Sequence, residues 1–79
     1  MKIEQYVSKT SHTIAAQVVY FRLYRKMTQA QLAAAIGTKQ PAIARLEKMP
    51  DDKWSWRTLE KIGAALDVRI SADIVPKGP

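Results

Sequence analysis

Residues 28–47, Thr-Gln-Ala-Gln-Leu-Ala-Ala-Ala-Ile-Gly-Thr-Lys-Gln-Pro-Ala-Ile-Ala-Arg-Leu-Glu, have the spacing that two short helices joined by a tight turn require. Ala33 and Gly37 lie four residues apart, and the apolar residues Ile43 and Leu46 follow. A small residue lets two helices touch, a glycine makes the sharp turn, and two apolar residues anchor the second helix. The stretch therefore predicts a helix-turn-helix, a motif that places its second helix in the major groove of DNA.

The composition of the chain agrees with an anionic partner. Seventy-nine residues form one small domain, with 13 Lys and Arg against 7 Asp and Glu, a net charge of +6 and a pI near 9.9. Such a balance favours nucleic acid or an anionic membrane surface. A domain of this size buries roughly 60–65% of its unfolded surface. It has no room for a deep substrate pocket, so we do not expect an enzyme.

Cysteine and histidine usage indicates neither a metal site nor a cofactor. The chain has no cysteine, and its one histidine, His12, cannot form a metal site alone. No apolar run approaches the roughly 20 residues that a membrane span needs. Residues 1–6 lack the apolar region of a signal peptide. We therefore expect a soluble cytoplasmic protein without membrane contact.

Helical periodicity begins after an N-terminal arm. Residues 1–10 have no helical stripe and are expected to be extended or disordered. The apolar residues that then recur at i, i+4 and i+7 are Ile14, Val18 and Phe21. Ser11 or Thr13 can cap the start of this helix, which is expected to end near Lys26.

The second and third helices have clear boundaries. Thr28 and Gln31 form a capping box, in which each side chain satisfies a backbone donor of the other residue. Gly37 ends the second helix, because glycine adopts positive φ at low cost. The third helix is expected over about residues 39–48, and Pro41 is tolerated there because it falls in the first turn.

A fourth helix and a strand complete the pattern. Residues 50–55 are polar and predict a loop, and Ser55 can cap the following helix. The apolar face of this helix consists of Leu59, Ile62, Gly63 and Leu66. From residue 68 to 75 the apolar period changes to two, which predicts a half-buried strand. We expect a mainly α fold, a four- to five-helix repressor-like helix-turn-helix domain with a short C-terminal β-strand.

The chain is expected to have three parts: an N-terminal arm over 1–10, a helix-turn-helix DNA-binding domain over 11–67, and a strand and tail over 68–79. A lone strand leaves backbone groups unpaired and needs a partner edge. The same strand of a second copy, across a two-fold axis, is the expected partner, which predicts a homodimer. An intramolecular hairpin of residues 3–7 with 68–75, in a monomer, is the alternative.

The chain resembles the phage-repressor/Cro-type (Xre-like) helix-turn-helix family over about residues 14–68. The residues that carry the resemblance are Phe21, Arg22, Arg25, Thr28, Gln29, Leu32, Ala33, Ile36, Gly37, Gln40, Ile43, Arg45 and Glu47, followed by Thr58, Leu59, Ile62, Ala65, Leu66 and Val68. The C-terminal strand with its Val-Pro end is also similar to small antitoxins of the host-inhibition-of-growth kind. Lys26 and Met49 stand where the family often has glycine, and Pro41 replaces a position that contacts a base in some relatives.

The resemblance implies a DNA contact surface on the second and third helices. It places Gln29, at the start of the second helix, against a phosphate, where free N–H groups attract an anion. Thr28, the cap of that helix, is a further candidate for DNA contact. It places Gln40 against a base, and a glutamine amide can bond N6 and N7 of adenine. The other candidate contacts are Lys39 and Arg45 to a base or phosphate, Ala42 to a thymine methyl group, and Lys48 and Arg57 to phosphates.

Several of these residues have an alternative structural interpretation. Gln40 could be a solvated surface residue, and Arg45 could pair with Glu47 or Asp51 instead of DNA. Arg22 is expected to bond Glu47 or a loop carbonyl inside the protein. The two tryptophans, Trp54 and Trp56, could stack on bases or fill a partner's pocket, but they are expected to cover the edge of the small core.

Together these features predict a sequence-specific double-stranded DNA-binding transcriptional regulator that acts on a palindromic operator. It would be a repressor or an antitoxin that represses its own operon. The alternative is a protein-interaction module that neutralises a cognate toxin or recruits another partner, with DNA binding as a secondary activity.

Overall fold

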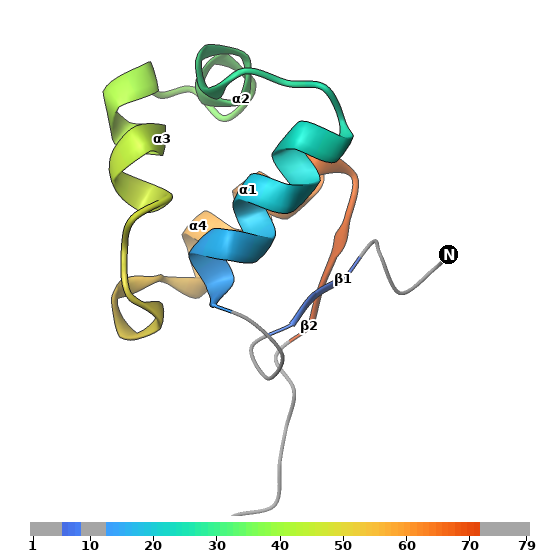
Figure 1. The fold of residues 1–79 in the computed structure, drawn as a ribbon, viewed down its shortest axis with the longest axis vertical. Coiled ribbons are helices and arrows are strands. Elements are labelled where there is room, and N and C mark those ends of the chain that lie inside the picture. Colours follow the sequence, from blue (N-terminus) through green and yellow to red (C-terminus); the bar gives the residue numbers. More distant parts are fainter. Residues whose placement is uncertain (1–5, 9–12, 72–79) are drawn as a thin grey trace, which may run out of the picture.

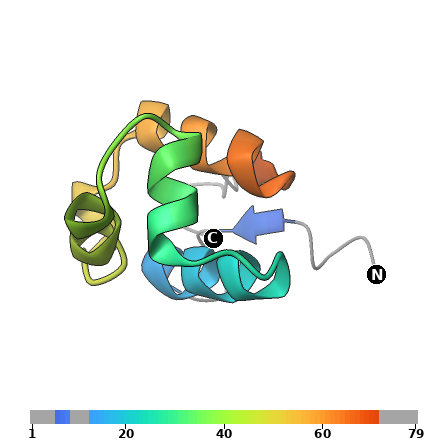
Figure 2. The same cartoon turned by 90° about the horizontal axis from the view of Figure 1, so that it is seen from above.

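The computed structural model describes residues 6–8 and 13–71. Its elements, in chain order, are β1 (Tyr6–Ser8), α1 (Ile14–Tyr24), α2 (Gln29–Ala35), α3 (Gln40–Leu46), a 3-10 helix (Asp51–Lys53), α4 (Trp56–Leu66) and β2 (Arg69–Ser71). Figure 1 shows α1 in front of α4, with α2 above them and α3 at the left. In Figure 2, α2 extends from α1 towards α4. The mainly α helix-turn-helix fold with a short C-terminal strand is confirmed.

The helices begin at the caps that the sequence predicts. The Thr13 hydroxyl accepts from the Ala16 N–H at 3.1 Å, so Thr13 caps α1, and Ser11 lies outside the described residues. Thr28 and Gln31 form both hydrogen bonds of the capping box at the start of α2. The Ser55 hydroxyl accepts from the Thr58 N–H at 3.1 Å and caps α4. Side-chain capping thus satisfies backbone donors that have no partner inside the helix.

Residues in the left-handed backbone conformation, with positive φ, lie in three of the turns between elements. Gly37, which ends the α2 turn, has φ 77°, Lys26 before α2 has φ 59°, and Asp67 after α4 has φ 58°. This conformation is disfavoured by a Cβ atom, which is why glycine is common in it. Lys26 therefore keeps the backbone conformation that the more frequent glycine would adopt. Met49 packs against the edge of the core, so its loop also tolerates a side chain.

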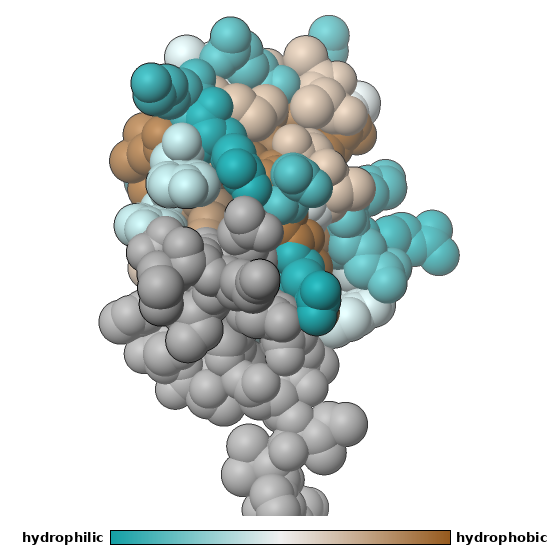
Figure 3. All heavy atoms as spheres, turned by 90° about the vertical axis from the view of Figure 1, so that its right-hand side faces the viewer, coloured by the Kyte–Doolittle hydropathy of each residue, from teal (hydrophilic) through white to brown (hydrophobic). Residues whose placement is uncertain are grey.

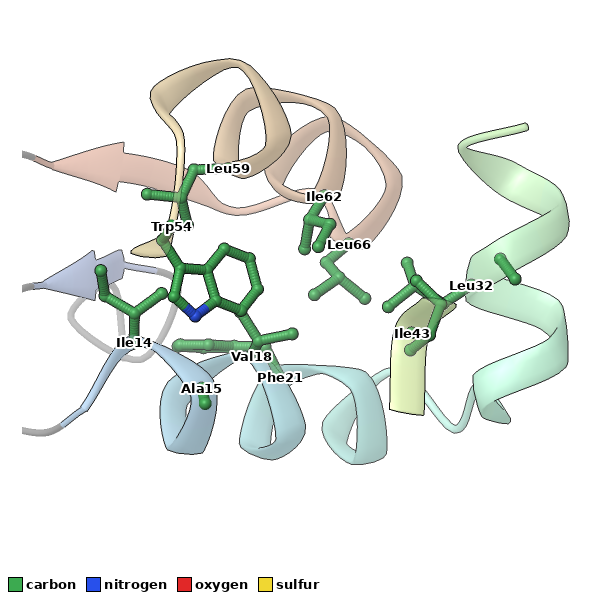
Figure 4. Packing of buried hydrophobic residues seen from close by; sticks show 11 residues of the cluster. Ile14, Ala15, Val18, Phe21, Leu32, Ile43, Trp54, Leu59, Ile62 and Leu66 are labelled. Carbon is green, nitrogen blue, oxygen red and sulfur yellow. The ribbon is translucent and has the colours of Figure 1, made fainter. Parts of the chain in front are cut away.

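The core lies between the helices and is small. Its buried apolar residues are Ile14, Ala15, Val18, Phe21, Leu32, Ala33, Ile43, Trp54, Leu59, Ile62 and Leu66. Figure 4 shows the Trp54 indole lying between α1 and α4, near Val18 and Leu59. The expectation that the tryptophans cover the core edge is thus confirmed for Trp54. Trp56 is instead 47% exposed and donates to Glu60 at 2.8 Å.

Two polar contacts link segments that lie far apart in the sequence. Arg25, at the end of α1, donates to the carbonyl oxygens of Leu66 and Asp67 at 2.7 and 2.9 Å. A cation at the C-terminus of α4 satisfies carbonyl groups that have no helical partner. At the other end of α1, the carboxylate of Asp51 accepts from the Ile14 N–H at 2.8 Å. Charged side chains therefore fasten both ends of α1 to distant parts of the chain.

The C-terminal strand has a different partner from the one expected. β2 pairs with β1 of the same chain, in parallel, with Val7 opposite Ile70. The expected pairing with a second copy is therefore not what the structure shows. The pairing of the N-terminal arm with this strand within the chain, which was the alternative, is present, but the strands run parallel and so do not form a hairpin. The segment from α1 to α4 separates β1 from β2, and this long connection allows the strands to run in the same direction. The predicted strand continued to residue 75, but residues 72–79 lie outside the described part.

The surface has both polar and apolar patches. In Figure 3, hydrophilic and hydrophobic side chains alternate over the coloured part of one face. The large exposed apolar side chains of α1 are Tyr20, Leu23 and Tyr24, and the rings of Tyr20 and Tyr24 stack with centroids 6.3 Å apart. None of the helices in the described part of the chain is both long and apolar enough to cross a membrane.

The close approach of α4 and β2 gives the first prediction. A Cβ atom at Gly63 would lie 2.7 Å from Cγ1 and 2.8 Å from Cδ1 of Ile70. Gly63→Ala should therefore destabilise the fold by about 1 kcal/mol, because overpacking outweighs the gain in helix propensity. Urea denaturation measures this cost. In an Ile70→Ala background the same change should cost less, because only the 3.2 Å approach to the Val68 carbonyl oxygen remains. An equal cost in both backgrounds would contradict the predicted clash.

Candidate nucleic-acid interface

The arrangement of α2 and α3 is fixed by the core beneath them. Leu32 and Ala33 of α2 and Ile43 of α3 are at most 1% exposed. The Thr38 N–H donates to the Ala33 carbonyl at 2.8 Å, which closes the turn around Gly37. These contacts leave the first residues of α3 exposed while the middle of the helix is anchored. The start of α3 is therefore a rigid platform for side chains that contact a ligand.

The predicted DNA-binding residues fall at helix ends and on exposed helix positions. Thr28 caps α2, and Gln29 is the first residue of that helix. Lys39 holds the N-cap position of α3 without a side-chain capping bond, and Gln40 is the first residue of α3. Ala42 lies in the first turn of α3, Arg45 in its last turn, Lys48 shortly after its end, and Arg57 in the first turn of α4. Gln29 and Ala42 are half-buried, and the other six residues are exposed. The site thus involves three helices.

A hydrogen bond brings together the two predicted glutamines. Nε2 of Gln40 donates to Oε1 of Gln29 at 2.7 Å, and Nε2 of Gln29 donates to Oε1 of Glu47 at 2.8 Å. Gln29 therefore connects the first residue of α3 to the residue that follows its last turn. The Gln40 amide is exposed but not freely rotating, since one of its groups has a protein partner.

An ion pair lies behind this contact. Nε of Arg22 donates to Oε2 of Glu47 at 2.6 Å, and Nη2 donates to Oε1 at 3.1 Å. Nη1 of Arg22 also donates to the Met27 carbonyl at 2.9 Å. The two charged side chains are only 10% and 6% exposed. The predicted internal role of Arg22 is confirmed, since it bonds both Glu47 and a loop carbonyl.

Arg45 lacks the protein partners proposed as an alternative to DNA. Glu47 is bonded to Arg22 and Gln29, and Asp51 accepts from the Ile14 N–H. Within residues 6–8 and 13–71, the structure contains no ion pair that involves Arg45. Its exposed guanidinium therefore has no acceptor among these residues and is available to an external one.

The link between Gln29 and Glu47 was not foreseen from the sequence, although the pattern contains a clue. Gln40 and Glu47 are seven residues apart, which is two helical turns, so both lie on one side of α3. Gln29 begins the helix that packs against that side. Polar residues at such facing positions, with an arginine available nearby, could have indicated a hydrogen-bonded network.

The described residues offer binding groups rather than a metal cluster. No group of three or more His, Cys, Asp or Glu residues in that part of the chain could hold a metal ion. What the site does offer is amide groups at fixed positions and exposed cations around them. An amide can donate and accept at the same time, whereas lysine and arginine only donate.

Comparison with known proteins agrees with this geometry. The family model of the Cro/C1-type HTH DNA-binding domain matches residues 21–75. None of the curated proteins and none of the solved structures matched the chain significantly. The matched segment contains α2, the turn, α3 and α4, and it covers well over half of the chain. The protein therefore belongs to the Cro/C1-type helix-turn-helix DNA-binding family.

Proposed function

We propose that the protein is a sequence-specific transcription regulator that recognises a double-stranded operator through α3. The observation that carries this proposal is the exposed Gln40 amide at the start of α3, held in place by Gln29. In a helix-turn-helix, the N-terminal residues of the second motif helix contact base edges in the major groove. Gln40 occupies that position, and its amide can bond N6 and N7 of one adenine.

Cations and helix-start residues around Gln40 supply phosphate contacts in this proposal. All four cations are exposed. In the proposed complex Lys48 and Arg57 contact the DNA backbone, while Lys39 and Arg45 contact a base or a phosphate. Ala42 packs against a thymine methyl group. Such backbone contacts set the orientation of the protein on DNA and carry no sequence information themselves.

The start of α2 contributes hydrogen-bond donors to a phosphate. The Thr28 hydroxyl oxygen accepts from the Gln31 N–H, which leaves its own O–H proton free to donate. The first-turn N–H group of Gln29 has no partner within the helix, and it lies where an anion is favoured. Gln29 would therefore contact a phosphate through its backbone while its side chain orients Gln40.

The regulator is either a cytoplasmic repressor or an antitoxin that represses its own operon.

A second candidate function, a module that binds a toxin or another protein, is favoured by one observation. Tyr20, Leu23 and Tyr24 expose about half or more of their surface on α1 and do not belong to the predicted DNA contacts. Gel shifts with the DNA upstream of its own gene, beside pull-down of the product of the adjacent gene, distinguish the two. Tight protein binding without a shift would favour the second candidate.

Gln40→Ala tests the proposed base contact. Loss of one bidentate contact should remove roughly 1–3 kcal/mol of discrimination between operator and scrambled DNA. Because Gln40 is exposed, the fold should remain intact, and circular dichroism checks this. Fluorescence anisotropy with both duplexes measures discrimination. An unchanged preference for the operator would contradict the role given to Gln40.

Salt dependence tests the phosphate contacts. Log affinity should fall with log salt concentration, with a slope of about −0.9 per neutralised phosphate. Lys39→Ala or Lys48→Ala should flatten this slope by about one unit and weaken binding to all sequences alike. Lys26→Ala is the control, since it removes the same charge from an exposed residue that is not one of the proposed DNA contacts. Binding that does not depend on salt would contradict an electrostatic contact surface.

We also propose that two copies act together as a symmetric dimer. The two-stranded sheet leaves one edge of β2 open within the described residues, and an open edge can pair with another chain. A two-fold dimer would place two recognition helices about 34 Å apart, on half-sites one helical turn distant. Two linked contacts raise the affinity above that of one small domain.

Analytical ultracentrifugation at micromolar concentration tests the dimer, with a chain that lacks residues 69–79 as comparison. We expect the full chain to sediment as a dimer and the shortened chain as a monomer with weaker operator binding. A helical circular dichroism spectrum must first show that the shortened chain folds. A monomeric mass for the full chain, with equal operator affinity for both, would exclude a dimer through this strand.

A further inference from the structure

We propose that Glu47, held by Arg22, is a positioning residue that fixes the direction of the Gln40 amide and thereby selects adenine over guanine. This inference rests on the proposed contact of Gln40 with a base. Four side chains form one hydrogen-bonded chain, from Arg22 through Glu47 and Gln29 to Gln40. Its three successive contacts measure 2.6, 2.8 and 2.7 Å.

The direction of these hydrogen bonds follows from the chemistry of Arg22 and Glu47. An arginine side chain only donates hydrogen bonds, and an ionised carboxylate only accepts them. Glu47 can therefore face Gln29 only if Gln29 turns its NH2 group towards the carboxylate. The carbonyl oxygen of Gln29 then points the other way, towards Gln40, and it can bond only the NH2 group of Gln40.

The groups of Gln40 that remain match adenine. One N–H of its NH2 group is used by Gln29, which leaves the second N–H and the carbonyl oxygen free. In the major groove adenine presents the N7 acceptor and the N6 donor, so donor meets acceptor at both positions. Guanine presents two acceptors, N7 and O6, and its O6 would face the carbonyl oxygen of Gln40. The fixed amide therefore disfavours guanine.

Burial preserves this orientation. The Glu47 side chain is 6% exposed and the Arg22 side chain 10%, so water has little access to the ion pair that starts the chain. Separating a buried ion pair leaves an uncompensated charge and is strongly unfavourable. Arg22 comes from α1 and is also bonded to the Met27 carbonyl, which fixes its guanidinium independently of DNA. The direction of the amides is thus set before any base is met.

Glu47→Gln should reverse the direction of the hydrogen bonds from residue 47 through Gln29 to Gln40. The oxygen of the new amide should keep the shortest contact, the one with Nε of Arg22, and give up the longer 3.1 Å contact with Nη2. Its NH2 group then takes the place of Oε1 and faces Gln29. The carbonyl of Gln29 then accepts, its NH2 group faces Gln40, and the carbonyl of Gln40 becomes occupied. Gln40 would present two N–H donors to the groove, which is the complement of guanine rather than adenine.

The experiment selects binding sites from a library of randomised DNA duplexes with the wild-type protein and three variants. Gln40→Ala identifies the base pair whose preference depends on Gln40. At that base pair, Glu47→Gln should lower the ratio of adenine to guanine by about 5-fold to 150-fold, the range that one bidentate contact supplies. Glu60→Gln removes the same charge from an exposed residue of α4, which accepts from the Trp56 indole, and it should leave the ratio unchanged.

The outcomes separate this inference from the proposed function. If the wild-type protein selects no sequence, the proposed function fails, and the inference fails with it. If Gln40→Ala changes one base pair but Glu47→Gln keeps the wild-type ratio there, only the inference fails. A loss of preference at every position alike would indicate a purely structural role and would also overturn it.

A second variant keeps the test valid if Glu47→Gln does not fold. Gln29→Met removes the connecting amide and leaves the Arg22–Glu47 ion pair in place. The Gln40 amide is then free to rotate, so the ratio of adenine to guanine at its base pair should fall towards one. Loss of a phosphate contact alone would weaken all sequences equally, so an unchanged ratio in this variant overturns the inference.

Discussion

The buried ion pair between Arg22 and Glu47 ties together the parts of the molecule that must keep a fixed relation. It connects α1 to the end of α3, and through the Met27 carbonyl it also holds the turn that leads into α2. A buried pair is costly unless its remaining groups are satisfied. Here each of the three guanidinium nitrogens of Arg22 and both carboxylate oxygens of Glu47 have hydrogen-bond partners.

At the edges of the core, too, polar side chains satisfy groups that the apolar core does not enclose. A domain of this size buries a modest fraction of its surface, and few side chains can be fully enclosed. Trp54 supplies one large apolar surface between α1 and α4. Arg25 and Asp51 then satisfy backbone groups at helix ends that the core does not reach. Polar contacts at the periphery therefore stabilise the helix ends that apolar packing leaves uncovered.

Local sequence determines most of what was predictable. The caps at Thr13, Thr28 and Ser55 depend on residues no more than three positions away, and the Gly37 turn depends on one residue. The boundaries of the helices follow from these features together with the apolar period. Pairing of β1 with β2 was only an alternative at the level of sequence, and its parallel direction could not be predicted in this way, because the two segments come from opposite ends of the chain.

The parts of the site that depend on tertiary contacts could not be predicted from the sequence either. Gln29 and Gln40 were recognisable as candidates from their positions, but the hydrogen bond between them appears only when α2 packs against α3. The pairing of Arg22 with Glu47 was foreseen as one of several alternatives. Its connection to Gln29 was not, since a sequence shows the spacing within α3 but not which residue of α2 faces it.

The physical difference between the amides and the cations of the interface suggests a division of roles. Exposed lysine and arginine side chains lose rotamer entropy when they are ordered, and a phosphate accepts them in many geometries. They suit contacts that hold any DNA. A base edge must be matched at two atoms, so the side chain that contacts it benefits from being ordered in advance. Gln40 alone among the proposed base-contacting residues has such a restraint within the described part of the chain. Discrimination should therefore depend on the network behind one amide, while affinity is spread over the cations around it.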